Sequence, residues 1–138
     1  MTTSHLPVLL GTAAAFGPGR ELTVVTVETA PLGRIVWVRI ESDYCVGSPS
    51  VYDCRGNTYT LYESRADESR SRRQAICYAH VMSAVDLGDA VTTRWPAEVD
   101  NRSVEVYATS PVLAEMATDL SAVLAEFRVA DPSGHYTL

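Results

Sequence analysis

The sequence predicts a mainly β protein: an antiparallel β-sandwich of about seven or eight strands, with an extended N-terminal arm and a C-terminal helix. Two observations favour this fold class. Between residues 21 and 110, short runs rich in β-branched and aromatic residues alternate with turn-forming Gly, Pro, Asn and Asp. From residue 112 the apolar residues instead recur every three or four positions, which is typical of an amphipathic helix. A chain of 138 residues needs only one hydrophobic core.

Residues 1–20 are predicted to form the arm. They mix Thr, Ala, Gly and Pro without a sustained period, and Gly17-Pro18-Gly19 separates them from the first strand. Only His5 could supply positive charge before the apolar stretch 6–16, whereas a signal peptide begins with basic residues. No run approaches the roughly 18 apolar residues of a membrane span. We therefore expect neither secretion nor a membrane partner.

Residues 21–110 are predicted to form the β-sandwich domain. The runs that resemble strands are 22–27, 34–40, 48–53, 57–62, 74–82, 90–95 and 102–109. The first two are apolar on both faces, so we expect them to lie centrally or to have one face covered by a neighbouring subunit. The stretch 63–73 is the most polar of the chain and is predicted to be an exposed loop.

A β-hairpin is predicted at Asp53-Cys54-Arg55-Gly56-Asn57. An Asp at the first position of a type I turn can accept hydrogen bonds from the following backbone, and a Gly three residues later can take a positive φ. We interpret Asp53, Gly56 and Asn57 as structural turn residues that set the register of the two flanking strands. They are not expected to contact a ligand.

The C-terminal part, residues 111–138, is predicted to be a helix with a short tail, packed on the domain or on a neighbouring subunit. Ser110 has the character of an N-cap and Pro111 suits the first turn. The helix is expected over residues 112–127. Its apolar stripe consists of Leu113, Met116, Leu120, Val123, Leu124 and Phe127, opposed by Glu115, Asp119 and Glu126.

The charge of the chain disfavours nucleic acid as a partner. The formal net charge is −6, and all basic residues are Arg. Because phosphate backbones repel a net negative domain, such binding would depend on one cluster of arginines, namely Arg65, Arg70, Arg72 and Arg73. We favour a solvated segment in which neighbouring acidic residues neutralise these arginines.

The sequence contains no recognisable catalytic or metal-binding pattern, so we expect no catalytic residue, metal or cofactor. Cys45, Cys54 and Cys77 make an odd count, which fits a reducing compartment with buried free thiols. Cys77 and His80 are three residues apart in a predicted strand and should point to opposite faces, which argues against a shared ion. Neither a G-x-S-x-G nucleophile elbow nor a Gly-rich phosphate loop occurs.

The tyrosines of the predicted strands allow two interpretations. Tyr52, Tyr59, Tyr62, Tyr78 and Tyr107 could form a platform that binds sugars. Tyrosines in strands more commonly pack against a half-buried sheet, and we favour that interpretation.

The segment Val51-Tyr52-Asp53-Cys54-Arg55-Gly56-Asn57-Thr58-Tyr59-Thr60 resembles a motif of Ig-like or jelly-roll-like β-sandwich domains in tailed-bacteriophage virion proteins, V-x-D-x-x-G-N-x-Y-x. Residues 77–81, 91–95 and 104–108 align with the later parts of the same pattern. The resemblance extends over residues 20–109 and does not include the arm or the helix.

The resemblance implies a non-enzymatic virion protein, made in the bacterial cytoplasm and incorporated into the particle. The size of the chain favours a capsid decoration (cement) or minor capsid protein, with the major capsid protein and further copies of itself as partners. A tail-associated protein and a module that binds host-surface glycans are the alternatives. The residues expected to make these contacts are Leu6, Val8, Leu9, Phe16, Arg70, Arg72 and Arg73.

Overall fold

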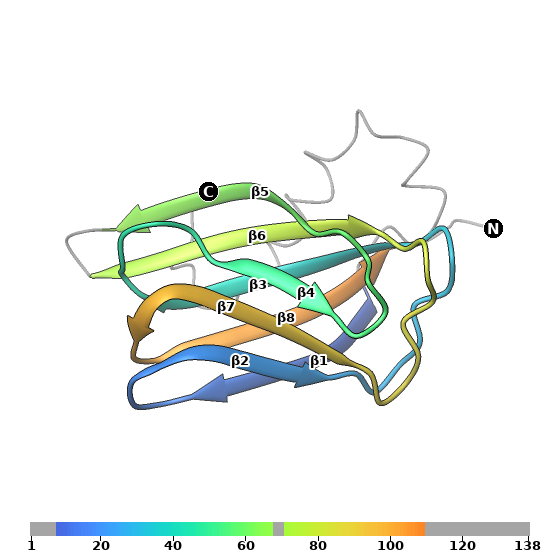
Figure 1. Ribbon diagram of the computed structural model, residues 1–138, viewed down its shortest axis with the longest axis horizontal. Helices are drawn as coiled ribbons and strands as arrows, with labels where there is room; N and C mark the ends of the chain where they lie inside the picture. Colours follow the sequence, from blue (N-terminus) through green and yellow to red (C-terminus); the bar gives the residue numbers. More distant parts are fainter. Residues whose placement is uncertain (1–7, 68–70, 110–138) are drawn as a thin grey trace.

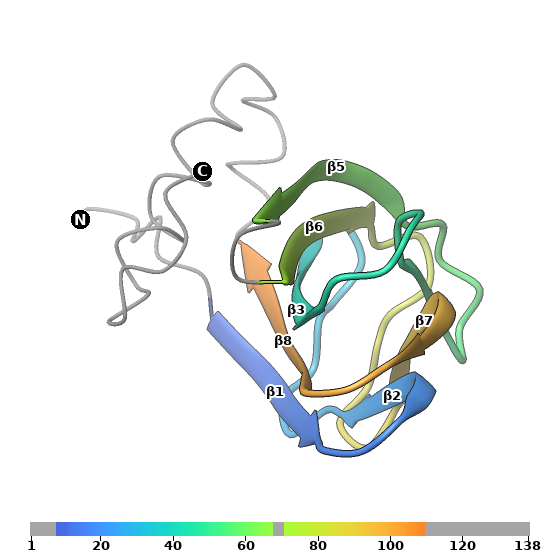
Figure 2. The same ribbon diagram turned by 90° about the vertical axis from the view of Figure 1, so that its left-hand side faces the viewer.

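A computed structural model describes residues 8–67 and 71–109 of the chain, and these residues form eight β-strands. The strands are β1 (Val8–Ala15), β2 (Gly19–Val25), β3 (Ile35–Asp43), β4 (Ser50–Asp53), β5 (Thr60–Asp67), β6 (Arg72–His80), β7 (Ala90–Val99) and β8 (Arg102–Thr109). They make two antiparallel sheets in the orders β1-β8-β3-β6-β5 and β2-β7-β4. The sheets are the two layers of a sandwich (Figures 1 and 2), so the predicted mainly β class is confirmed.

The strand β3 lies at the centre of the five-stranded sheet, between β8 and β6, as its apolar sequence predicts. Its residues are nearly all buried. For residues 22–27 a central position is wrong, because β2 is an edge strand of the smaller sheet and Val25 is exposed; the alternative, one face covered by a neighbouring subunit, stays a prediction. Of the two strands that are apolar on both faces, β3 is therefore central in its sheet and β2 lies at an edge.

The core lies between the two sheets. It includes Leu10 of β1, Val24 of β2, Val38 of β3 and Trp95 of β7, all nearly inaccessible to water. The indole Nε1 of Trp95 donates a hydrogen bond of 2.9 Å to the hydroxyl of Ser42, so the one polar atom of this ring is satisfied inside the core.

Residues 8–20 do not form the predicted extended arm. β1 pairs with β8 along most of its length, and β2 already begins at Gly19. At Gly11 the backbone of β1 passes so close to β2 that a Cβ atom would lie 2.8 Å from Val24 Cγ1 and 3.0 Å from the Val25 carbonyl oxygen. The sheet hydrogen bonds and this close approach, rather than β-propensity, explain why the segment is a strand. Residues 1–7 lie outside the described residues.

The polar stretch 63–73 is likewise mostly strand and not a loop. β5 continues to Asp67 and pairs with β6 from Arg72 onward. Its polarity fits its position, since β5 is an edge strand and charged edge strands resist pairing with other chains. The predicted helix 112–127 and its tail lie outside the described residues.

Candidate functional site

Three connections meet at one end of the sandwich, on the right in Figure 1. They are residues 26–34 between β2 and β3, residues 54–59 between β4 and β5, and residues 81–89 between β6 and β7. We call this part of the molecule the loop end. The first and third connections lie side by side, because Ala30 and Val85 exchange backbone hydrogen bonds of 2.7 and 3.0 Å.

The turn at Asp53–Asn57 is not a β-hairpin, because β4 belongs to the three-stranded sheet and β5 to the five-stranded sheet. The local chemistry nevertheless follows the sequence. Asp53 Oδ1 accepts hydrogen bonds from the backbone N–H of Arg55 (2.8 Å) and Asn57 (3.2 Å), and Gly56 has a φ of 80°. The predicted role in strand register is therefore wrong, and the turn instead carries the chain from one sheet to the other.

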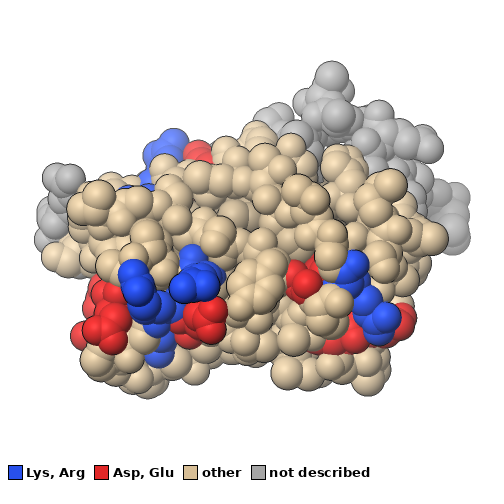
Figure 3. Space-filling view, in the orientation of Figure 1, with Lys and Arg blue, Asp and Glu red and all other residues tan. Residues whose placement is uncertain are grey.

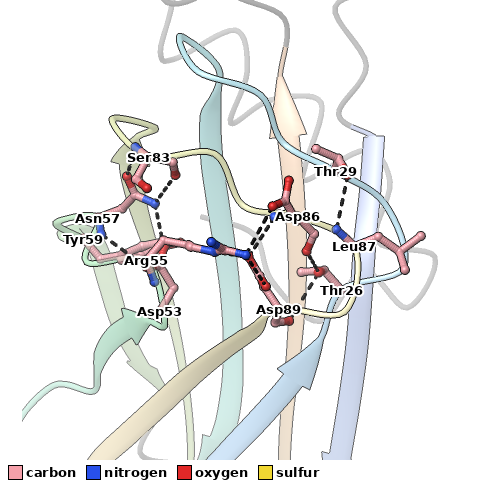
Figure 4. Close-up of polar contacts among 10 residues, drawn as sticks. All are labelled: Thr26, Thr29, Asp53, Arg55, Asn57, Tyr59, Ser83, Asp86, Leu87 and Asp89. Carbon is pink, nitrogen blue, oxygen red and sulfur yellow. Dashed lines mark hydrogen bonds and ion pairs between the residues drawn. The ribbon is translucent and has the colours of Figure 1, made fainter.

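The other carboxylate oxygen of Asp53 anchors two side chains (Figure 4). Oδ2 accepts hydrogen bonds from Asn57 Nδ2 at 3.0 Å and from the Tyr59 hydroxyl at 2.9 Å. Burial, followed by the charge of Asp53, raises the pKa of the Tyr59 hydroxyl well above its ordinary value. Tyr59 therefore remains protonated and able to donate this hydrogen bond at any physiological pH.

Asn57 joins this turn to the connection 81–89. Its Oδ1 accepts hydrogen bonds from the backbone N–H of Met82 (2.8 Å) and Ser83 (3.0 Å), and its Nδ2 donates to the Ser83 carbonyl oxygen at 2.9 Å. The side chain is buried. Its carbonyl and amide groups are thus used together, which makes Asn57 the residue that couples the two connections.

Arg55 adds a set of ion pairs at the surface of the loop end. Its guanidinium contacts Asp89 at 2.6 Å and Asp86 at 3.2 Å. The hydrogen bond from Arg55 holds the pKa of Asp89 below its ordinary value. In Figure 3 most charged side chains of the face in view gather in two groups, one toward each end, with uncharged surface between them. Exposed pairs of this kind orient side chains more than they stabilise a fold.

Two threonines of the connection 26–34 make hydrogen bonds to the connection 81–89. The Thr26 hydroxyl donates to the Asp86 carbonyl oxygen at 2.8 Å, and its backbone N–H donates to the Asp89 carbonyl oxygen at 2.9 Å. The Thr29 hydroxyl accepts a hydrogen bond of 3.2 Å from the backbone N–H of Leu87 (Figure 4). The backbone of the loop end is therefore held by hydrogen bonds across all three connections.

Apolar side chains project from this hydrogen-bonded backbone into water. They are Val25, Val27, Leu32, Met82 and Leu87, whose exposed fractions range from 59% for Val25 to 80% for Met82. Exposed apolar side chains that gather in one region are typical of protein interaction surfaces. We call these five residues the apolar loop-end residues.

The apolar loop-end residues were not among the interaction candidates predicted from the sequence. A signal was present in the turns Ala30-Pro31-Leu32-Gly33 and Asp86-Leu87-Gly88-Asp89, where a single Leu stands among turn-forming residues. Turn composition predicts exposure of such a Leu. It does not predict that the two turns lie at the same end of the molecule.

The apolar interaction candidates from the N-terminal region lie at opposite ends of β1. Val8 and Leu9 are exposed near the loop end, where Val8 faces Ala108 in the sheet. Phe16 is exposed in the turn between β1 and β2, at the opposite end. Leu6 lies outside the described residues. These candidates therefore do not form one surface.

The arginine candidates are engaged within their own sheet. Arg72 pairs with Asp43 at 3.2 Å and with Glu41 at 3.6 Å. Arg73 donates hydrogen bonds to the hydroxyl of Ser64 and to the carbonyl oxygen of Cys45. Arg70 lies outside the described residues. The expectation of an exposed loop with arginines that project from it is therefore wrong for Arg72 and Arg73.

The cysteines and histidines of the described residues do not come together. Cys77 is buried in the core and His80, on the other face of β6, is exposed, which confirms the predicted opposition. Burial raises the pKa of the Cys77 thiol to about 12. Cys45 is also buried, but Cys54 is exposed, against the expectation of buried thiols throughout. Within residues 8–67 and 71–109, no group of three or more His, Cys, Asp or Glu side chains could hold a metal ion.

The part of the chain that the structure describes contains no helix with the length and apolar character needed to cross a membrane. No protein-family model, curated protein or solved structure matches the chain.

Proposed function

We propose that this protein is a non-enzymatic structural virion protein of a tailed bacteriophage, most specifically a decoration (cement) or minor capsid protein that binds the outer surface of the major capsid shell. One observation carries the proposal: the apolar loop-end residues project from a backbone that three connections hold by hydrogen bonds. The resemblance of residues 51–60 to phage virion domains supports the choice of partner.

The physical chemistry of the loop end suits binding to a protein. Each apolar side chain that moves from water into an interface contributes roughly 25 cal/mol for every Å² that it buries. The contacts of Asn57 and Thr26 fix the connections in advance, so that less conformational entropy is lost on binding. Even a weak contact of this kind can stabilise a capsid, because many copies bind the same symmetric particle at once.

The glycan-binding alternative gains less support. Tyr62 is 37% exposed, but its ring makes edge contacts with Trp37 at 6.1 Å and with Tyr78 at 6.2 Å between centroids. Aromatic rings in such contacts pack against one another, whereas a sugar platform needs a ring with a free face. A tail-associated role would use the same kind of surface. The two virion roles are therefore distinguished by where the protein is found, on the head or on the tail.

Fractionation of particles tests the proposed location. Purified virions are separated into heads and tails, and the protein is quantified in each fraction by mass spectrometry. The proposal predicts that it is found with the heads. Its recovery with tails alone, or with neither fraction, would contradict the proposal.

A matched pair of variants tests the proposed surface. Met82 at the loop end is 80% exposed, and Val46 at the opposite end is 81% exposed. Met82→Asp should weaken binding to heads that lack the protein at least about tenfold, since a carboxylate would be desolvated at the interface. Val46→Asp should leave binding unchanged. An equal effect of both substitutions, or no effect of Met82→Asp, would exclude the loop end as the contact.

A further inference from the structure

The outer face of the five-stranded sheet, turned away from the smaller sheet, is built like an interior surface. Val36 and Val38 of β3 belong to the core between the sheets, so the alternate residues Ile35, Trp37 and Arg39 point outward. Their exposed fractions are only 1%, 0% and 6%. The outer face of a two-layer antiparallel sandwich ordinarily meets water and carries polar residues. These three side chains do not follow that pattern.

Aromatic rings form a band across this outer face. Trp37 lies opposite Tyr107 of β8 and opposite Tyr78 of β6 in the sheet register. The ring centroids of Trp37 and Tyr78 are 5.6 Å apart, and Tyr62 of β5 meets both rings edge-on. Beside the band, Ile76 is only 1% exposed. An apolar surface of this composition is stable when another layer covers it.

Several polar groups of the face are also withdrawn from water, although the Glu105 side chain is 38% exposed. Arg39 pairs with Glu105 at 3.3 Å, although arginine is rarely buried. The indole Nε1 of Trp37 donates to the Thr109 hydroxyl at 3.4 Å, and both residues are buried. Burial, followed by the charge of Glu105, raises the pKa of the Tyr107 hydroxyl to about 12. The burial of both apolar and polar side chains on this face therefore indicates that another layer covers it.

We propose that residues 112–127 of the same chain form an amphipathic helix that covers this outer face, with the stripe of Leu113, Met116, Leu120, Val123, Leu124 and Phe127 against the aromatic band. This inference does not depend on the virion role. β8 ends at Thr109, which lies opposite Ile35 on the face itself. The three backbone steps from Thr109 to residue 112 can span about 10 Å, the separation of packed layers.

The lengths of the two elements agree. A helix over residues 112–127 is about 24 Å long, and β3, with nine residues, extends about 30 Å. The stripe has the apolar character of the surface that it would cover, while Glu115, Asp119 and Glu126 would remain in water. The short connection from Thr109 favours the helix of the same chain over that of a second copy.

Two substitutions in the full chain test the proposal. Leu120→Asp places a carboxylate in the stripe, and Ala122→Asp places the same group on the opposite side of the predicted helix. The indole N–H signals of Trp37 and Trp95 are followed by NMR in the presence of a soluble gadolinium chelate. Trp95 lies between the sheets and serves as the internal reference.

The expected result is specific to one indole. In the wild-type chain and in Ala122→Asp both indole signals should be protected from the chelate. In Leu120→Asp the paramagnetic relaxation of the Trp37 signal should rise at least fivefold, while that of Trp95 stays unchanged. A folded Leu120→Asp variant in which Trp37 remains as protected as Trp95 would overturn the proposal.

A measurement on the wild-type chain keeps the proposal testable if Leu120→Asp does not fold. Isotope-filtered NOEs are recorded on a mixture of labelled and unlabelled copies. NOEs within one chain, from the Trp37 ring to methyl groups of residues 112–127, would support the proposal. NOEs only between chains, or none to these methyl groups, would overturn it.

Discussion

Replacing Asn57 by Ala removes the side chain that joins the Asp53 turn to the connection 81–89. Four hydrogen bonds of 2.8 to 3.0 Å are lost: those from Nδ2 to the Asp53 carboxylate and the Ser83 carbonyl oxygen, and those that Oδ1 accepts from the N–H groups of Met82 and Ser83. A typical hydrogen bond contributes about 0.5–1.5 kcal/mol net, and unpaired polar groups left in a buried site add to the loss. Allowing for water that replaces part of the contacts, we expect the free energy of unfolding to fall by about 2–4 kcal/mol.

Urea unfolding followed by far-UV circular dichroism measures this loss, with Thr58→Ala as the matched control. Thr58 is the next residue along the chain and is exposed. Its substitution should change the free energy of unfolding by less than about 0.5 kcal/mol. If Asn57→Ala were no more destabilising than Thr58→Ala, the hydrogen bonds of Asn57 would not hold the loop end together, and its description as a rigid surface would be wrong.

Three further predictions concern Gly11 and the cysteines. Gly11→Ala should lower the free energy of unfolding by about 1–3 kcal/mol in the same urea assay, because its Cβ would meet the backbone oxygen of Val25 at 3.0 Å; an unchanged midpoint would show that β1 can move away. For the cysteines, iodoacetamide at pH 8 followed by mass spectrometry should modify exposed Cys54 while buried Cys77 stays unmodified, and equal modification would contradict this. Burial raises the pKa of Cys77 from about 9 to about 12, so its contribution to stability is complete below pH 9 and is lost as the pH rises toward 12. Cys77→Ala should therefore show a smaller loss of stability than the wild type between pH 9 and 11.

The strands illustrate what the sequence can and cannot predict. The central position of β3 follows from its composition, because residues that are apolar on both faces need a covering on both faces. β1 could not be predicted in the same way. Its three Ala residues and its Gly have little β-propensity, and the strand exists because its backbone pairs with β8, far away in the sequence.

The loop end shows the same division between local and distant information. The hydrogen bonds of Asp53 to the following backbone and the positive φ of Gly56 were predictable from turn chemistry. The contacts of Asn57 with Met82 and Ser83 were not, because nothing in residues 53–57 indicates that the connection 81–89 lies beside them. For the same reason, residues that are exposed and apolar could not be grouped into one surface from sequence alone.

A cryo-EM map of phage heads with the protein bound tests the central claim most directly. The account predicts the sandwich on the outer surface of the shell, with the loop end facing the major capsid protein and Met82 and Leu87 in the contact. A sandwich attached through the opposite end, around Phe16 and Val46, would contradict the assigned surface. Its absence from the shell and its presence on the tail would contradict the proposed role.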